Sequence, residues 1–426
     1  MDAANSAISD TSQAVSPSRI FWAAWAGWML DGFDSAAYGL LLVSALNELL
    51  PLGGVEASKA NIAVYGGLGF SIFMLGWACS MFWGWMADRI GRVRTMCITI
   101  LWYSIFTALC GLTFGITTFL VLRFLVGFGI GGEWAAGTPL LHESVPESIR
   151  VRLAGWLHTA TPTGIILASV GALVVVPLFG WRGMFLIGVL PALLTIYLRL
   201  RIREPQRARP AQEASSIRPL FTGEQAIVTW GAALMLAASI LGLWSSTFWI
   251  PTVVATKFMA SGSTLAQSQQ MASLASLISN FGTFAGCFLM PWIVAWFGSR
   301  KTVGILFFIG ALVCNVIAYY GLLERLDDIK LFLIALPVLG FFTNGVFALF
   351  TIWLPELFGS QSRGAGIGFA FSLGRILAAA GPIMIGALAA HTGSFPVAIT
   401  LVSMIYLPGV FFVMMCRETT GKALPV

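Results

Sequence analysis

Charged side chains are scarce in this chain of 426 residues, where lysine, arginine, aspartate and glutamate together make up only 10%. Soluble domains carry about 25%. Apolar residues reach 58%, which is more than the core of one soluble domain can bury. The composition therefore excludes a soluble globular protein and indicates a chain surrounded by lipid. The net charge of +6 is expected to collect on one side of the membrane, and it does not indicate a nucleic-acid partner.

Paired cysteines are also lacking. The six cysteines lie in apolar runs, without the spacing of disulfide pairs or zinc ligands, at positions 79, 97, 110, 287, 314 and 416. We expect them to be small buried hydrophobic residues. The sequence has no cluster of metal ligands, no Ser/His/Asp set at a shared depth and no soluble catalytic segment. These absences argue against a membrane enzyme, and the short tails argue against a sensor with a signalling domain.

Long apolar runs make up most of the sequence. Each run can cross about 30 Å as a helix. The twelve runs fall in two sets of six, near residues 20–46, 61–85, 95–114, 119–142, 153–178, 182–200, 226–250, 268–296, 302–323, 331–355, 364–390 and 394–416. We therefore predict an all-α membrane protein with twelve transmembrane helices in two six-helix pseudo-repeats.

Polar stretches divide the chain into five segments. We expect a disordered cytosolic tail, a six-helix bundle, a basic cytosolic linker, a second six-helix bundle and a cytosolic tail at 1–19, 20–200, 201–225, 226–416 and 417–426. The first tail lacks the basic start and apolar core of a signal peptide. With both termini in the cytosol, seventeen of the 24 lysines and arginines lie in cytosolic segments and five in outer loops. This bias is what the positive-inside rule predicts.

The two halves of the chain also align with each other. Shifted by 213 residues, Glu143 falls on Glu356 and Arg150 on Arg363. A parallel duplication of six spans builds two bundles that hold substrate between them at mid-depth. Functional charges are then expected to break the repeat. Arg123, Glu133 and Arg375 do so, because they align with Leu336, Val346 and Pro162.

Four charged residues are expected to couple transport to protons. Asp31 and Asp34 lie three residues apart in the first span, so we expect them on one helix face. Two carboxylates in a low dielectric oppose each other's ionisation and can hold a proton near neutral pH. We predict proton coupling by Asp34 with Arg123 as its partner, while Asp31 could couple protons or only fix helix packing. Glu133 has three open interpretations: a second proton carrier, a substrate contact, or a hydrogen-bonded group that ties the fourth span to the first.

Arg375 is the only basic residue inside a span of the second half. A charge at this depth costs roughly 2.5–3.5 kcal/mol on insertion scales, and a planar guanidinium suits a carboxylate. We predict that Arg375 binds the substrate, with a buried salt bridge as the alternative. His158 could relay protons or be an ordinary core histidine. Trp134, Trp156, Trp244 and Trp249 lie where aromatic cavity walls would suit a planar or hydrophobic acid.

A specific motif follows the second predicted span. The segment Gly84-Trp-Met-Ala-Asp88-Arg89-Ile-Gly91-Arg92-Val-Arg94 matches the signature G-x-L-A-D-R-x-G-R-R/K, with Met86 in place of leucine. With its twelve spans and internal repeat, the chain resembles the major facilitator superfamily over about residues 20–420. A degenerate second copy, Phe297-Gly298-Ser-Arg300-Lys301, lacks the aspartate.

Three further segments narrow the resemblance: Asp31-Gly32-Phe33-Asp34, Gly132-Glu133-Trp134 and Gly374-Arg375. They are similar to the sialate:proton, metabolite:proton and aromatic-acid:proton symporters. The resemblance implies uptake of an organic acid anion with protons, in which a span-one acid and the span-four arginine form a pair that breaks on protonation. Monocarboxylates, aromatic acids and acidic sugars are the candidate substrates. An exporter or an uncoupled facilitator is the alternative. We expect a monomer in the lipid bilayer of the inner membrane, with the proton as coupling ion and no cofactor.

The cytosolic loops are expected to close the inside of the transporter. Asp88 could face the amino end of the eleventh span or bond to Arg92. Charge pairs of this kind would latch one conformation and release in the other, although they could also only set topology and cap helices. The predicted latch comprises Gly84, Asp88, Arg89, Gly91, Arg92, Glu143 with Arg150, and Glu356 with Arg363.

Overall fold

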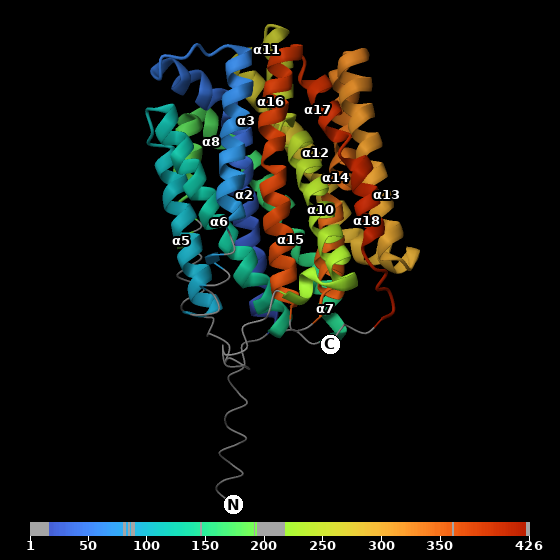
Figure 1. Ribbon diagram of the computed structural model, residues 1–426. Coiled ribbons are helices and arrows are strands. Elements are labelled where there is room, and N and C mark those ends of the chain that lie inside the picture. The colour runs from blue at the N-terminus through green and yellow to red at the C-terminus, as the bar shows by residue number, and fades with distance from the viewer. Residues whose placement is uncertain are drawn as a thin grey trace, which may run out of the picture.

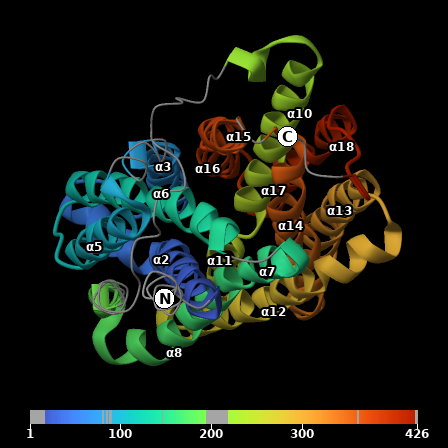
Figure 2. The same ribbon diagram turned by 90° about the horizontal axis from the view of Figure 1, so that it is seen from below.

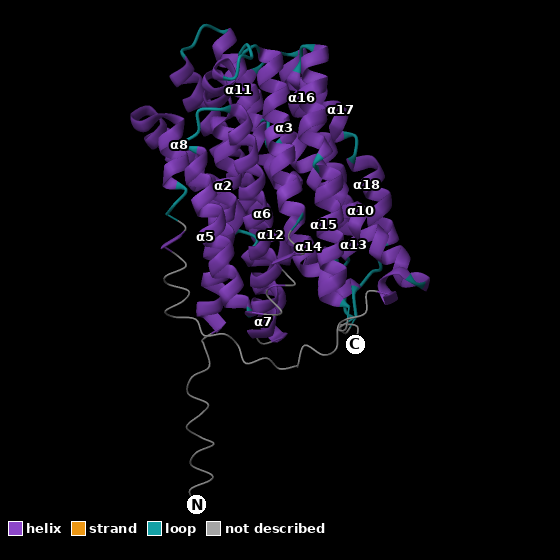
Figure 3. Ribbon diagram, turned by 60° about the vertical axis from the view of Figure 1, so that its left-hand side comes forward, coloured by secondary structure: helices purple, strands orange, loops and turns teal. Residues whose placement is uncertain are grey.

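The computed structural model shows a bundle of long helices. Within the described ranges the chain forms helices and loops and no strand (Figure 3), which confirms the predicted all-α fold. In lipid a helix satisfies its own backbone hydrogen bonds, and this is why long apolar runs fold this way. The structure describes residues 17–79, 82–83, 86, 90–144, 147–190, 192–193, 218–359 and 362–422. Within these ranges, the side chains of some helical residues are not described.

The helices of the first half begin three residues before the predicted bundle. They are α2 (Pro17–Leu52), α3 (Lys59–Ala78), α5 (Arg92–Cys110), α6 (Ile116–Ser144), α7 (Glu147–Leu157) and α8 (Ala160–Ile187).

The helices of the second half begin inside the predicted linker, whose last residues form a 3-10 turn and the start of α10. They are η2 (Arg218–Phe221), α10 (Gly223–Ser246), α11 (Ile250–Ala260), α12 (Leu265–Phe297), α13 (Arg300–Asn315), η3 (Val316–Arg325), α14 (Ile329–Leu357), α15 (Arg363–Ala378), α16 (Ala380–Thr392), α17 (Phe395–Ser403) and α18 (Tyr406–Met415).

Ten helical stretches of the described chain are long and apolar enough to cross a membrane, and a shorter apolar stretch, Ile116–Gly132, lies within α6. Several predicted spans are built from two consecutive helices, such as α15 with α16 in the span predicted at 364–390. The fifth and sixth predicted spans meet at Gly180, whose φ of 66° bends α8. Only glycine adopts this backbone conformation without strain. The sixth predicted span, 182–200, lies partly outside the described residues.

The internal repeat is visible in the helix boundaries. Both α6 and α14 are 29 residues long, and they begin at Ile116 and Ile329, 213 residues apart. In each half this helix packs against a long neighbour, α3 for α6 and α12 for α14. The offset found in the sequence is therefore also the offset between equivalent helices.

The two halves meet along two pairs of helices, α3 with α16 and α8 with α12 (Figures 1 and 2). The first contact is very close. A Cβ added to Gly67 of α3 would lie 2.4 Å from the carbonyl oxygen of Pro382, and one added to Gly386 of α16 would lie 2.3 Å from that of Ala63. Small residues let membrane helices approach to this distance. A site between these helix pairs is therefore lined by residues of both halves.

The bundle has two distinct ends. Helix α2 begins and α18 ends at the same one (Figure 1), which we call the terminal end. The opposite end, where α2 ends and α12 begins, is the far end.

Candidate functional site

A cavity of about 90 Å³ lies between the two halves. Its lining residues come from α2, α3, α8 and the link before α8 on one side, and from α10, α11, the link between them, α12, α14 and α15 on the other. A buried water needs about 10–15 Å³, so several waters or a small ligand fit. Typical ligand pockets hold roughly 300–1,000 Å³. A larger ligand therefore requires the halves to move apart.

Arg375 forms part of the wall of this cavity. It lies on α15, and only 4% of its surface is exposed. Its guanidinium carbon is 4.5 Å from the ring centre of Trp77 on α3 and 5.2 Å from that of Phe371. Aromatic faces attract a guanidinium but do not neutralise it. The position suits a residue that binds an anion, as the sequence predicted for Arg375.

Asp31 lines the same cavity from α2 and is 3% exposed. Ser35 donates a hydrogen bond of 3.5 Å to Asp31 Oδ1. The carboxylate is close enough to Arg375 for an electrostatic interaction between the two charges. Because α2 and α15 belong to different halves, this interaction crosses the interface.

Asp34 faces the interior of the first half. Its Oδ2 lies 3.9 Å from Arg123 Nη1, and Thr107 on α5 donates a hydrogen bond to Oδ1. Neither residue of the ion pair is among those that line the cavity. Asp31 and Asp34 therefore have different partners, whereas the sequence predicted that they would act on each other. A spacing of three residues is close to one helical turn of 3.6, so it permits a shared face but does not require a shared partner.

Arg123 is fully buried, with 0% exposure. Its guanidinium carbon lies 4.7 Å from the ring centre of Tyr38 and 4.6 Å from that of Phe73. Among the described residues none of its three side-chain nitrogens has a hydrogen-bond partner. One ion pair and two aromatic faces are therefore the described contacts that stabilise the positive charge of Arg123. Loss of the Asp34 charge would leave the charge of Arg123 uncompensated.

His158 and Trp156, two predicted binding residues that are two positions apart in the sequence, lie in different places. His158 lines the cavity, with its ring stacked at 5.8 Å on Phe347 and edge-on at 5.8 Å to Trp28. Trp156 is not among the lining residues and stacks at 6.0 Å on Phe288 of α12, where the halves meet. The side chains of Glu133 and Trp134 lie outside the described part of the chain.

Sequence reasoning missed several lining residues. Asn280 on α12 and Asn344 on α14 are buried amides in the wall. Their polarity inside apolar spans was a usable signal, because polar groups in membrane helices are often functional. Trp77 and Phe248 gave no such signal, since aromatic residues are common in all these helices.

Toward the far end, hydrogen bonds join the halves. Gln269 on α12 accepts a 3.1 Å hydrogen bond from Ser44 Oγ and donates one from Nε2 to the carbonyl oxygen of Leu40. Next to them Phe248 stacks on Phe70 with ring centres 4.1 Å apart. The halves are thus in contact between the cavity and the far end.

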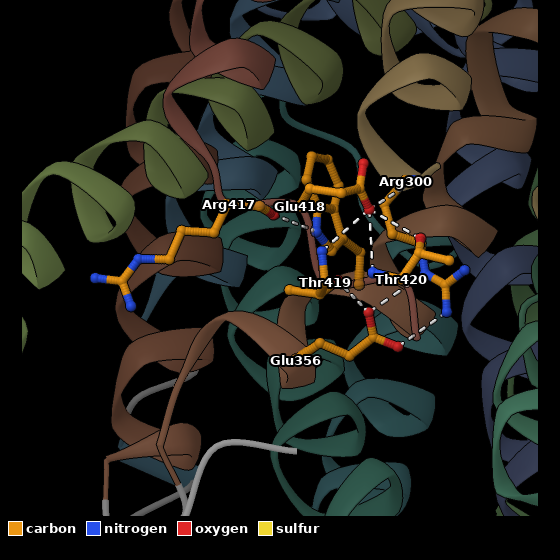
Figure 4. A network of polar contacts seen from close by, with 7 residues as sticks. Arg300, Glu356, Arg417, Glu418, Thr419 and Thr420 are labelled. Atoms are coloured by element: carbon orange, nitrogen blue, oxygen red, sulfur yellow. Dashed lines mark hydrogen bonds and ion pairs between the residues drawn. The ribbon is translucent and has the colours of Figure 1, made fainter. Parts of the chain in front are cut away.

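At the terminal end, Glu356 and Glu418 organise a polar network (Figure 4). Glu356 forms an ion pair of 3.1 Å with Arg300 and accepts a hydrogen bond from Thr419. Glu418 accepts hydrogen bonds from Ser299 Oγ at 2.6 Å and from the backbone N–H of Arg300 at 3.1 Å. The network ties the end of α14, the start of α13 and the segment after α18 together.

The other latch residues are mostly outside the description. Glu356, predicted to pair with Arg363, has Arg300 as its described partner. Gly91 precedes α5 with a φ of 106°, a conformation that favours glycine. Outside the described part lie Gly84, Asp88 and Arg89, together with the side chains of Arg92, Glu143, Arg150 and Arg363.

Comparison with known proteins gives consistent matches. A sequence model of the Major Facilitator Superfamily matches residues 24–325. A probable 4-methylmuconolactone transporter of Cupriavidus pinatubonensis is 28% identical over 415 residues, covering 95% of this chain and 92% of that protein. The sialic acid transporter NanX of Escherichia coli is 25% identical over 382 residues, or 88% of each chain.

A solved structure shares the fold. The proton:xylose symporter XylE bound to 6-bromo-6-deoxy-D-glucose has a TM-score of 0.74 and 18% identity, covering 95% of this chain and 97% of its own. At this identity the match establishes the architecture alone.

Proposed function

This chain belongs to the Major Facilitator Superfamily and is a membrane transporter, not an enzyme, and on that premise we propose that it takes up a small organic acid anion together with protons. Alternating access of the cavity to the two sides of the membrane would carry the anion across. The predicted superfamily and the multi-pass membrane architecture are confirmed. The substrate, the coupling and the direction of transport are the proposal.

The observation that carries the proposal is Arg375 in the wall of the cavity between the halves. A guanidinium that is 4% exposed has lost most of its hydration, and an anionic ligand would form charge-assisted hydrogen bonds with it. Its planar fork matches both oxygens of a carboxylate. The cavity thus selects for a carboxylate rather than a neutral solute.

Asp31 provides a way to couple this binding to a proton. Its carboxylate interacts with Arg375 across the interface, so it competes with a substrate carboxylate for the same cation. A proton on Asp31 removes the competitor and leaves the positive charge for the substrate. Proton and anion would then enter the cavity together, without a net change of its charge.

Asp34 and Arg123 would sense a proton inside the first half. Protonation of Asp34 removes the charge that balances the buried Arg123, and an uncompensated buried charge favours rearrangement of the helices around it. Three helices of the first half meet at this pair, because Asp34 lies on α2, Thr107 on α5 and Arg123 on α6. The pair can therefore shift how these helices pack.

Several properties of the substrate follow from the site and the relatives. The relatives described above are named for 4-methylmuconolactone and for sialic acid, so organic acids and their lactones are the natural test set. Monocarboxylates, aromatic acids and acidic sugars remain the candidate classes. We further propose that the protein acts as a monomer in the inner membrane with both termini in the cytosol, which places basic Arg300 and Lys301 inside.

Reconstituted vesicles test the proposal. Radiolabelled lactate, benzoate and glucuronate represent the three classes. With the outer solution acidified, at least one should accumulate faster and further than in protein-free vesicles, and a protonophore should abolish accumulation. Equilibration without accumulation would identify a facilitator, and accumulation that requires the opposite pH gradient would identify an exporter. Failure of Arg375→Gln to reduce uptake would remove Arg375 from the site.

A further inference from the structure

Asn344 of α14 presents an amide to the cavity between the halves. The residue lines the cavity and is 7% exposed, so protein encloses more than nine tenths of its surface. Within the described part of the chain its side chain forms no hydrogen bond, and its amide atoms are not among the unbonded groups that are sealed inside the protein. They therefore keep surface toward the cavity. Buried polar groups nearly always have a hydrogen-bond partner, and here the contents of the cavity are in a position to supply it.

Asn280 of α12 adds an acceptor to the same wall. It lines the cavity and is 8% exposed. Its Nδ2 donates a 2.9 Å hydrogen bond to the carbonyl oxygen of Ser276. No described residue donates to its Oδ1, and this oxygen is not sealed inside the protein either. Two amides of the second half therefore offer acceptor oxygens to the cavity.

Helices α12 and α14 hold these amides in defined positions. The two helices pack against each other, and Thr283 on α12 donates a 3.2 Å hydrogen bond to the carbonyl oxygen of Gly340 on α14. A Cβ added to Gly340 would lie 2.2 Å from the carbonyl oxygen of Ser279, so the two backbones are in contact here. Asn280 follows Ser279 directly, and Asn344 lies about one turn after Gly340. Binding groups on rigid helices are placed more precisely than groups on loops, which suits selection among ligands.

Asn344 also breaks the internal repeat. At the 213-residue offset between α6 and α14, its position corresponds to Gly131. The equivalent helix of the first half therefore has no side chain there that could form a hydrogen bond. Polar groups inside membrane spans are costly and often functional, so an amide present in one half alone indicates a role at the cavity rather than in the shared fold.

We propose that Asn344 binds a hydroxyl group of the substrate, so that the protein selects hydroxylated acids over the same acids without the hydroxyl. The inference rests on the proposed function and narrows its substrate class. An ionised carboxylate only accepts hydrogen bonds, whereas a hydroxyl both donates and accepts. A wall with two amide acceptors therefore cannot be satisfied by the carboxylate of the substrate, and a hydroxyl elsewhere on the molecule can satisfy it.

Selectivity would come mainly from rejection of the wrong acid. Water in the cavity can form hydrogen bonds with the amide of Asn344 before the substrate enters. A hydroxylated acid displaces this water and replaces its hydrogen bonds. An acid without the hydroxyl displaces the water and leaves a buried polar group unsatisfied, which is unfavourable. Sites that hydrogen-bond a substrate hydroxyl reject analogues that lack it for this reason.

Pairs of acids that differ only in their hydroxyl groups test the inference. The pairs are lactate with propionate, 4-hydroxybenzoate with benzoate, and glucuronate with tetrahydropyran-2-carboxylate. Dissociation constants are measured by calorimetry on purified protein. The parent should bind the hydroxylated acid of at least one pair about 5- to 100-fold more tightly, the range for leaving one buried polar group unpaired. Asn344→Leu should remove most of that preference, because leucine neither donates nor accepts.

The matched control is Asn315→Leu, which removes another buried amide. Asn315 on α13 donates a 2.8 Å hydrogen bond to the carbonyl oxygen of Ala311, and it is not among the residues that line the cavity. This variant should keep the preference of the parent for the hydroxylated acid.

Two results would overturn the inference and leave the proposed function in place. One is equal binding of both acids of every pair by the parent, and the other is a preference that Asn344→Leu does not reduce. If the parent binds no acid of any pair, or if Arg375→Gln leaves binding intact, the proposed function itself fails. Should Asn344→Leu not fold, Asn344→Ala removes the same amide without adding apolar volume.

Discussion

Two buried arginines and their two acids would carry most of the proposed transport chemistry at the scale of single residues. Arg123 lies between two aromatic rings with Asp34 as its one ion-pair partner. Arg375 lies on the cavity wall, within electrostatic reach of Asp31. Removing one partner of a buried ion pair typically costs about 3–5 kcal/mol. Protonation of Asp34 is therefore a large energetic event for Arg123.

Asp34→Asn should uncouple transport from protons. Asparagine imitates the protonated acid, so the state in which Arg123 lacks a counter-charge becomes permanent. We expect substrate exchange across vesicle membranes to persist while accumulation driven by a pH gradient is lost. Asp327→Asn, at the exposed ion pair with Lys257, is the control and should behave as the parent. Normal pH-driven accumulation by Asp34→Asn would exclude Asp34 from the coupling.

Arg375→Lys should weaken binding although it preserves the charge. Lysine lacks the planar fork that holds both carboxylate oxygens, and losing a hydrogen bond to a charged group costs roughly 1.5–3 kcal/mol. The dissociation constant of the acid, measured by calorimetry, should rise accordingly, while thermal unfolding without ligand changes little. Arg325→Lys, the same substitution on the exposed η3, should leave binding unchanged. Equal binding by Arg375→Lys would mean that only charge matters.

The charged residues of the site and one of their pairings could be predicted from the sequence. Arg123 and Arg375 stand out because each breaks the internal repeat in an apolar span. Arg123 was predicted as the partner of Asp34, and the structure has the two side chains 3.9 Å apart. The interaction of Asp31 with Arg375 depends on how helices of different halves face one another, which spacing along α2 does not reveal.

At the scale of elements, the segment after α18 is tied to the rest of the second half. This terminal strap, residues 416–422, holds α14 through the 3.1 Å hydrogen bond from Trp353 Nε1 to the carbonyl oxygen of Arg417. It holds α13 through Glu418, which accepts from backbone N–H groups at the start of that helix. A carboxylate is favourable there because the amino end of a helix carries partial positive charge. The predicted cytosolic tail is therefore structured where it is described.

Glu418 should make stability depend on pH. Burial of the carboxylate opposes its ionisation, but hydrogen bonds from Ser299, Thr420 and Arg300 outweigh that effect and lower its pKa from 4.5 to about 2. A folded-state pKa below the unfolded value adds stability above pH 4.5, and this stability is lost as the pH falls from about 4.5 to about 2. Thermal unfolding should show that Glu418→Gln lowers the melting temperature at pH 7 and that the difference from the parent shrinks toward pH 3.

The control for this measurement is Glu324→Gln, which removes an exposed carboxylate from η3 that accepts a hydrogen bond from Ser394. It should lower the melting temperature less than Glu418→Gln. A difference between Glu418→Gln and the parent that stays constant from pH 7 to pH 3 would show that the charge of Glu418 does not stabilise the strap.

At the scale of the whole molecule, the lipid environment makes the fold predictable from the sequence. The way the two halves pack against each other is not predictable in the same way. Apolar runs long enough to cross a bilayer must become helices, so the bundle and its repeat followed from hydropathy and from the 213-residue offset. Which helices meet between the halves depends on surface shape. The close approach of α3 to α16 rests on Gly67 and Gly386, and the sequence alone does not show which of its many glycines make such contacts.

Gln269 should control how readily the halves separate at the far end. Its two hydrogen bonds, to Ser44 and to the carbonyl oxygen of Leu40, cross the interface, and a leucine at this position cannot form either. Gln269→Leu should therefore favour opening toward the far end, which is the outside in the proposed orientation. A cysteine introduced at Ala36 in the cavity wall, with Cys79 replaced by serine, would report this as faster labelling by a membrane-impermeant thiol reagent added outside.

Gln270→Leu, an exposed neighbour on the same helix, controls for the added apolar side chain. Labelling at the same rate in Gln269→Leu and Gln270→Leu would mean that packing of Phe248 on Phe70, rather than these hydrogen bonds, keeps the far end closed.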